Sequence, residues 1–183
     1  MSRTWVYSDP HFGHANICKF TNYDGTKVRP WDDVTHMNEA LVSNYNALVH
    51  PDDRVYILGD FAMSPGVFKS IMPRLLGRKV LVPGNHEPKG CIKWCADNNV
   101  EVRGYVVKKG FIMSHIPIHP GCLSRWELNI HGHLHNNAVG IQPSASHAQD
   151  FAEDVRYYCA CVERTGFAPI LLDDVLKERG LRP

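Results

Sequence analysis

Short apolar runs alternate with amphipathic stretches along this chain, and most of the runs end at glycine or proline. The runs are rich in β-branched and aromatic residues, which is typical of buried strands. We predict strands over residues 4–8, 54–60, 79–86, 100–107, 110–115, 127–133 and 155–162. Apolar residues at helical spacing predict helices over residues 35–49, 65–76, 89–98 and 172–179. This mixture of elements favours an α/β protein.

Two of the predicted helices begin with capping signals. Thr35 is the expected N-cap of the first helix, and Ser64 that of the second, with Pro65 in its first turn. Residues 136–154 are polar and rich in turn-forming residues, so we expect a loop there.

Length and composition place the chain among ordinary globular proteins. The 183 residues suit one domain over residues 1–183, and 44% of them are apolar. Lysine and arginine number 20 against 19 acidic residues, so net charge gives no support for binding nucleic acid or a membrane. We find no signal peptide and no apolar run of membrane-spanning length, and we expect a cytoplasmic protein whose six cysteines are reduced.

Polar side chains follow five of the predicted strands at the point where each strand ends. They are Asp9, His11, Asp60, Asn85, His86, His115, His133 and His135. Because ligands of α/β proteins sit beyond the carboxyl ends of the strands, we expect these residues to form one cluster. The stretch at 129–137, with three histidines at alternate positions, would by itself also permit a catalytic site or an exposed polar turn.

Carboxylate, amide and imidazole ligands without thiolate suit zinc, manganese, iron or nickel. Their number exceeds the needs of one tetrahedral ion but fits two ions that share a bridging carboxylate. Such a pair can clamp a phosphate group. The pairs Cys91–Cys95 and Cys159–Cys161 are the alternative metal ligands, but they lack the spacing of a zinc knuckle.

The segments SDPHFGH, LGDF, PGNHE, MSHIP and HGHLH occur in this order between residues 8 and 135. The sequence thereby resembles the calcineurin-like metallophosphoesterases, as a compact member of the bacterial or phage type without a capping domain. The resemblance implies a four-layer α/β/β/α sandwich with two mixed sheets and the active site at one sheet edge.

The resemblance also implies that two divalent transition-metal ions are bound, manganese first, with zinc, iron or nickel as alternatives. The implied ligands are Asp9, His11 and His135 for the first ion, Asp60 as the bridge, and Asn85, His115 and His133 for the second. A hydroxide between the ions would attack the phosphorus atom. His131 matches no ligand position, and we expect it to pack beside the site.

His86 matches the catalytic histidine of the family and would protonate the leaving oxygen as a general acid. Glu87 is expected to support the ligands rather than bind metal. Substrate contacts are expected from Asn85 and His86. His14, His119 and Arg125 are further candidates, with helix initiation as the alternative for His14 and a solvated surface as the alternative for the other two.

The expected function is hydrolysis of a phosphoester, foremost a small phosphodiester or a nucleotide such as a cyclic nucleotide. Pro83 precedes the Gly-Asn-His motif where the family's protein phosphatases carry arginine, which argues against a protein phosphatase. One alternative is a metal-dependent nuclease acting on nucleic-acid ends. The other is a module that binds metal or phosphate without catalysis. The sequence indicates no oligomeric state.

Overall fold

The computed structural model describes residues 2–22, 24–141 and 152–182. Its strands form two mixed sheets and one short two-stranded ladder, so the expected α/β class is confirmed. The first sheet has the order β11-β1-β2-β3-β4. Its strands are β1 (Thr4–Tyr7), β2 (Arg54–Ile57), β3 (Arg78–Leu81), β4 (Glu101–Val102) and β11 (Ile170–Leu171). β1 to β4 run parallel, and β11 pairs antiparallel with β1.

The second sheet has the order β10-β7-β6-β5. Its strands are β5 (Val106–Lys108), β6 (Phe111–Ser114), β7 (Leu128–His131) and β10 (Tyr157–Cys159). Only β5 runs antiparallel to its neighbour within this sheet. β8 (Gly140–Ile141) and β9 (Ala152–Glu153) form the separate ladder.

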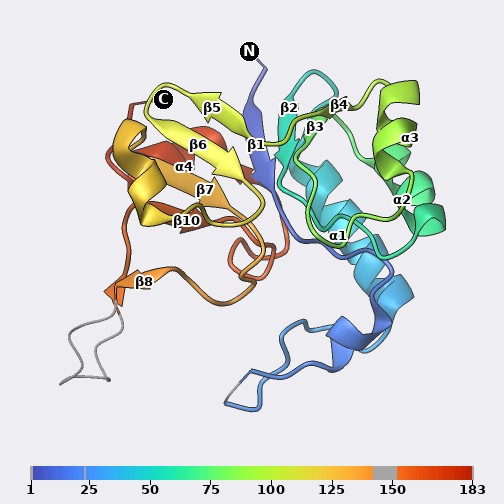
Figure 1. The fold of residues 1–183 in the computed structure, drawn as a ribbon. Coiled ribbons are helices and arrows are strands. Elements are labelled where there is room, and N and C mark those ends of the chain that lie inside the picture. The colour runs from blue at the N-terminus through green and yellow to red at the C-terminus, as the bar shows by residue number, and fades with distance from the viewer. Residues whose placement is uncertain (1, 23, 142–151, 183) are drawn as a thin grey trace.

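Three of the four α-helices in the described residues connect the parallel strands of the first sheet, because a parallel pair needs a long crossover. They are α1 (Val34–Leu48), α2 (Pro65–Ile71) and α3 (Cys91–Asp97). All three lie on one side of that sheet, and α4 (Leu172–Glu178) lies beside the second sheet (Figure 1). Three short 3-10 helices complete the fold, namely η1 (Ala15–Lys19), η2 (Met72–Arg74) and η3 (Pro120–Arg125).

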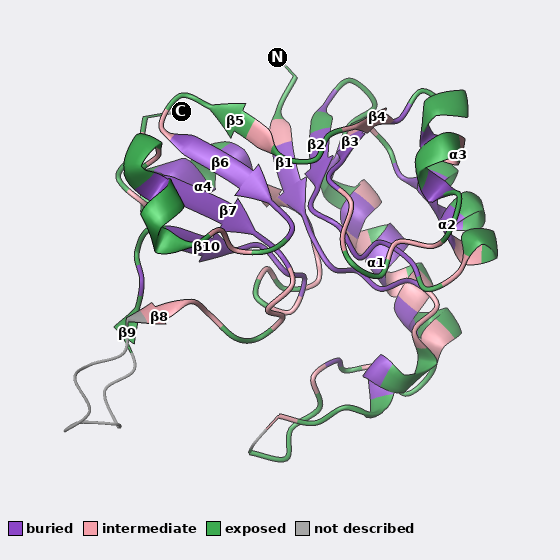
Figure 2. Ribbon diagram, in the orientation of Figure 1, coloured by how far each residue is buried: buried purple, intermediate pink, exposed green. Residues whose placement is uncertain are grey.

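Alternate residues of the strands supply the two main cores, as the two-residue repeat of a strand requires. Trp5 and Tyr7 of β1 face the core shared with helices α1 to α3. Val6 faces the opposite core, which joins the two sheets and α4. Buried residues therefore run through the strands of both sheets, while the outer surfaces of the helices are exposed (Figure 2).

The structure corrects the predicted cap of the first helix and one predicted strand. α1 begins at Val34, and its N-cap is Asp33, not Thr35, because the Asp33 carboxylate accepts the backbone N–H of His36 at 2.9 Å. The single strand predicted over 100–107 is two strands, since the chain leaves the first sheet after Val102 and enters the second at Val106.

The loop expected over 136–154 contains β8 and β9, while residues 142–151 lie outside the described part of the chain. The Ser64 cap is confirmed, because its side chain accepts the Val67 N–H. Within the described residues, no helix has both the length and the apolar character needed to cross a membrane.

Candidate metal centre

Two compact groups of aspartate and histidine side chains lie where strands of both sheets end. The first group is Asp9, His11 and His135, and the second group is Asp60, His115 and His133. Within each group, one ligand atom per residue lies within 4.8 Å of the others. The groups contain no cysteine. Each group can therefore hold a metal ion through oxygen and nitrogen ligands.

The Asp60 carboxylate faces residues of both groups. Its Oδ2 lies 3.5 Å from Nε2 of His11, and its Oδ1 lies 3.6 Å from Nε2 of His115. Asp60 is almost fully buried and follows β2, the central strand of the first sheet. One carboxylate with an oxygen toward each group has the placement that a bridging ligand requires.

Asn85 joins the second group through its side-chain oxygen, which lies 2.9 Å from Nε2 of His115. His86, the next residue, is exposed, and its ring centroid lies 5.6 Å from that of His11. The backbone N–H of His86 donates to Asp60 Oδ1 at 2.8 Å, which fixes the loop after β3 against the second group.

Several buried polar atoms of the first group have no hydrogen-bond partner among the described residues. They are Oδ1 of Asp9 and both ring nitrogens of His11. Burial, with a smaller effect of nearby His135, lowers the pKa of His11 to about 2, so its ring is neutral and offers a lone pair. Burial also raises the pKa of Asp9. Because buried polar atoms are normally paired, these residues fit divalent cations.

A second observation of the same kind concerns His115. Its Nδ1 lies 2.8 Å from the carbonyl oxygen of Leu58, which can only accept, so the ring proton sits on Nδ1. In the neutral ring, Nε2 then presents a lone pair to the Asn85 oxygen, which is also an acceptor. A cation bound by both atoms would satisfy this contact, and so would the Asn85 amide turned to present its NH₂ group.

The backbone is strained at most of the candidate ligands. Seven non-glycine residues of the described chain have positive φ, and five belong to the two groups, namely Asp9 (55°), His11 (49°), Asp60 (47°), His133 (70°) and His135 (51°). Each such residue costs on the order of 1–3 kcal/mol, and this strain clusters at functional sites. With this backbone conformation, the side chains of His133 and His135 both point toward the centre.

Two residues that sequence reasoning missed support the first group. The Glu163 carboxylate, buried after β10, accepts from Nδ1 of His135 at 3.0 Å and directs the other ring nitrogen toward the group. The fully buried Arg29 guanidinium binds that carboxylate at 2.6 Å and also donates to the Asp9 carbonyl at 2.8 Å. The position of Glu163 directly after a predicted strand could have indicated a site residue. Arg29 lies in a polar stretch, and no sequence pattern there indicates a role at the site.

Glu87 lies in neither group. Its carboxylate accepts the backbone N–H groups of Phe61 at 3.2 Å and Gly84 at 3.3 Å, so it links the loops after β2 and β3. Burial raises the pKa of Glu87 to about 7. Gly84 itself stands directly against Asp60, where a Cβ atom would meet the Asp60 carboxylate.

The other predicted residues belong to neither group, although His14 lies about as close to His11 as His86 does. His14 caps η1, accepting the Ile17 N–H at 3.1 Å, and its ring centroid is 5.7 Å from that of His11. His119 caps η3, Arg125 ends it, and both are exposed. His131 is fully buried inside β7, and its Nδ1 donates to the Gly132 carbonyl at 2.8 Å.

The sequence matches no known protein-family profile. It is 31% identical over 180 residues to the uncharacterized protein MJ1445 of Methanocaldococcus jannaschii, covering 97% of this chain and 91% of that protein. It is 36% identical over 93 residues to the Gene 66 protein of Mycobacterium phage L5, covering 48% of this chain and 41% of that protein. The crystal structure of the protein of unknown function AQ665 from Aquifex aeolicus shares the fold, with a TM-score of 0.65, 23% identity and coverage of 97% of this chain and 100% of that chain.

Proposed function

We propose that this chain, which belongs to the same family as the uncharacterized protein MJ1445, is a metal-dependent phosphoesterase with a calcineurin-like sandwich, and most specifically a phosphodiesterase. The observation that carries the proposal is the placement of Asp60 between the two Asp/His groups. The five motifs that supply these side chains, in their order along the chain, add support.

Seven residues would hold two divalent ions: Asp9, His11 and His135 on one, Asp60 on both, and Asn85, His115 and His133 on the other. When bound, such ions polarise a phosphoryl oxygen and offset its charge. Only two of these ligands are carboxylates, so the loaded centre keeps positive charge and favours an anionic substrate. Manganese is the first candidate for both ions, with zinc, iron or nickel as alternatives.

His86 is the proposed general acid. Its side chain is exposed beside the first group, so it can reach a bound ester, whereas the neighbouring His11 is buried. Its backbone is held by Asp60, which keeps the ring close to the centre. A positioned histidine at this place would donate its proton to the oxygen of the departing alcohol.

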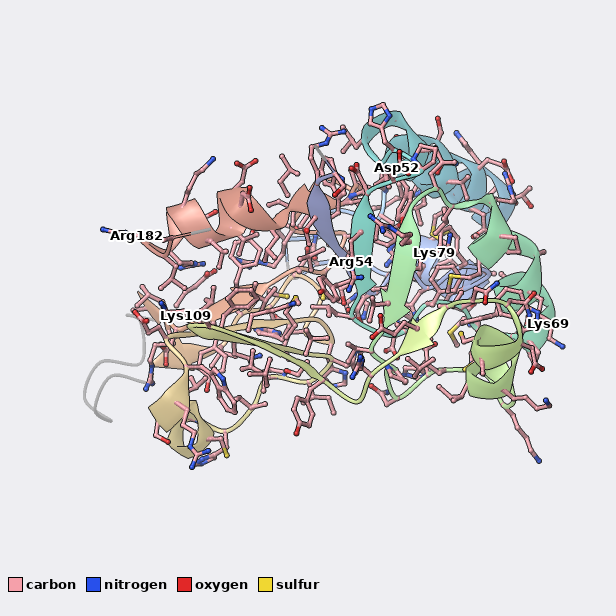
Figure 3. All side chains as sticks on the ribbon, turned by 90° about the horizontal axis from the view of Figure 1, so that it is seen from above. Asp52, Arg54, Lys69, Lys79, Lys109 and Arg182 are labelled. Carbon is pink, nitrogen blue, oxygen red and sulfur yellow. The ribbon has the colours of Figure 1, made fainter. Side chains whose placement is uncertain are left out.

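A nuclease would need basic side chains leading to the centre. Figure 3 shows basic residues at the opposite end, where the strands begin, with Arg54 at the start of β2, Lys109 between β5 and β6, and Arg182 near the C-terminus. A cavity of about 940 Å³ there is lined by all three, and its lining includes no member of the two groups. These basic residues do not lead to the centre, so they give no support to a nucleic-acid strand as the substrate.

The test is a hydrolysis panel with protein loaded with manganese, zinc, iron or nickel. It compares a phosphomonoester, a phosphodiester, 2′,3′- and 3′,5′-cyclic nucleotides and short single strands. We expect turnover of a small diester or cyclic nucleotide that disappears on chelation and in Asp60→Asn. Preferential cleavage of strands from an end would favour the nuclease. Tight metal binding without turnover of any substrate would identify a binding module and refute the proposal.

A further inference from the structure

A second cavity adjoins the candidate metal centre. It has a volume of about 550 Å³, and its lining includes Asn85 and His115, two of the candidate ligands. From these residues it extends over side chains that carry no charge, among them Tyr105, Ile116 and Trp126. A ligand whose anionic end lay at the metal centre would therefore reach directly into an uncharged, mainly apolar pocket.

Two large side chains of this pocket face solvent. Tyr105 is 61% exposed and Ile116 is 53% exposed, although both are apolar over most of their surface. Neither belongs to the hydrophobic cores or to the partly buried residues packed on them. Exposed apolar groups that gather in a hollow beside a polar site are typical of ligand pockets.

The pocket is lined by segments that adjoin the strands of both sheets. Tyr105 lies in the segment between β4 and β5, and Ile116 follows the ligand His115 by one residue. Trp126, at the end of η3, is partly buried against the small core of Ile112 and Leu123 on the outer face of the second sheet. The pocket thus has one ordered wall and two exposed side chains at its rim.

We infer that this pocket, here called the Tyr105 pocket, binds a planar, uncharged organic group such as a nucleobase or an aryl ring, carried by the phosphoester whose phosphate lies at the metal centre. The inference rests on the proposed function, which supplies the site for the phosphate. Among the described residues, the lining contains no lysine, arginine, aspartate or glutamate, which disfavours a second phosphate or a charged group. Tyr105 and Trp126 offer aromatic faces on which a flat ring can stack.

The experiment measures equilibrium binding to the full chain with Mn²⁺ present, so it does not depend on turnover. The probes are adenosine 5′-monophosphate and ribose 5-phosphate, which share the phosphate and differ in the base. We expect the wild-type protein to prefer the nucleotide by roughly tenfold or more, as base stacking on an aromatic side chain would give. In Tyr105→Ala and Ile116→Ala this preference should fall to about twofold or less, with unchanged affinity for ribose 5-phosphate.

Val155→Ala is the matched control, because Val155 is 68% exposed and does not line the pocket. It should keep the full preference. Equal affinity for the two probes in the wild-type protein, or a preference that survives both pocket variants, would overturn the inference. The inference would also be overturned if neither adenosine 5′-monophosphate nor ribose 5-phosphate bound to the wild-type protein.

Adenosine separates this inference from the proposed function. If adenosine binds and Tyr105→Ala weakens its binding while no ester is hydrolysed, the pocket stands and the proposed function fails. If esters are hydrolysed but the base contributes nothing to binding, the proposed function stands and the Tyr105 pocket is refuted.

Discussion

The Glu163 carboxylate accepts a hydrogen bond from Nδ1 of His135 at 3.0 Å, and the two residues are 28 positions apart in the chain. The Arg29 guanidinium, which is fully buried, donates to the same oxygen, Oε1, at 2.6 Å. The His135 ring is therefore oriented by a buried ion pair. A carboxylate that orients a histidine ligand also raises the basicity of that ligand.

Glu163→Gln should weaken Mn²⁺ binding by roughly 10–100-fold, because the neutral amide orients His135 less firmly. It should also lower the free energy of unfolding by about 3 kcal/mol, since Arg29 loses its buried counter-charge. Titration calorimetry and urea unfolding measure the two effects. Glu153→Gln, which breaks only the surface pair with Arg164, should change neither; equal Mn²⁺ affinity in both variants would contradict the role of Glu163.

Asp60→Asn should abolish turnover and lower the number of Mn²⁺ ions bound. The aspartate has one carboxylate oxygen toward each group, whereas the asparagine amide has only one oxygen, which carries no full charge and binds metal weakly. A metal at 100 times its Kd should stabilise the wild-type protein by about 2.7 kcal/mol. Most of that gain should be missing in the variant. Thermal unfolding with Mn²⁺ or a chelator measures it, with the exposed Asp97→Asn as control. Wild-type activity in Asp60→Asn would exclude the bridging role.

His86→Ala should reduce kcat by roughly 10²–10⁴-fold through the loss of general-acid catalysis. Its Mn²⁺ affinity should stay near that of the wild-type protein, because His86 belongs to neither Asp/His group. Steady-state kinetics on esters with good and poor leaving groups checks the mechanism, since a good leaving group needs little protonation. His36→Ala, at an exposed histidine of α1, is the control. An equal loss for both kinds of ester would argue against the proton-donor role.

Gly132→Ala should damage the centre by steric contact. A Cβ atom at Gly132 would meet the Ser8 hydroxyl, the Asp9 carboxylate and the Leu58 carbonyl. We expect a loss of about 1–3 kcal/mol in stability, as for overpacking of a core, together with weaker Mn²⁺ binding. Gly66→Ala is the matched control, because a Cβ there meets nothing within 4 Å. Chemical denaturation compares the two, and equal stability would show that the centre tolerates the methyl group.

The pH dependence of stability should depend in part on Asp53. Burial raises the pKa of this carboxyl, but hydrogen bonds outweigh that effect and bring the pKa to about 2. The donors are the backbone N–H groups of Arg3 at 2.7 Å and His50 at 3.0 Å and the Trp5 indole at 2.8 Å. Because the folded-state pKa lies below the ordinary value of about 3.9, the stabilisation is complete above pH 4 and is lost as pH falls toward 2.

Asp53→Asn should therefore cost about 2 kcal/mol at pH 7, the size of hydrogen bonds to a charged group, and much less near pH 2. Urea unfolding at several pH values measures the difference from the wild-type protein. The exposed neighbour Asp52→Asn should have little effect at any pH. A difference that stays constant down to pH 2 would show that the charge of Asp53 is not the cause.

Local sequence signals were enough to predict most of the elements and the convergence of the polar strand ends. Asp9 and Asp60 each follow an apolar run, and parallel strands bring such ends to one edge. The Ser64 cap followed from its own side chain and the proline after it. The single strand predicted over 100–107 is wrong because Gly104 interrupts it, but that glycine does not by itself show that the chain changes sheet there.

The amino-acid sequence alone was sufficient for properties that depend on neighbours in the chain: strand runs, caps, and which residue types stand at strand ends. Only the tertiary structure could pair Arg29 with Glu163, which are 134 positions apart. It also decided that Asp60 faces His11 and His115 together, and that a pocket with Tyr105 at its rim opens beside Asn85. These relationships depend on side chains from separate strands and loops, whose distances are set by the packing of two sheets and not by any spacing along the chain.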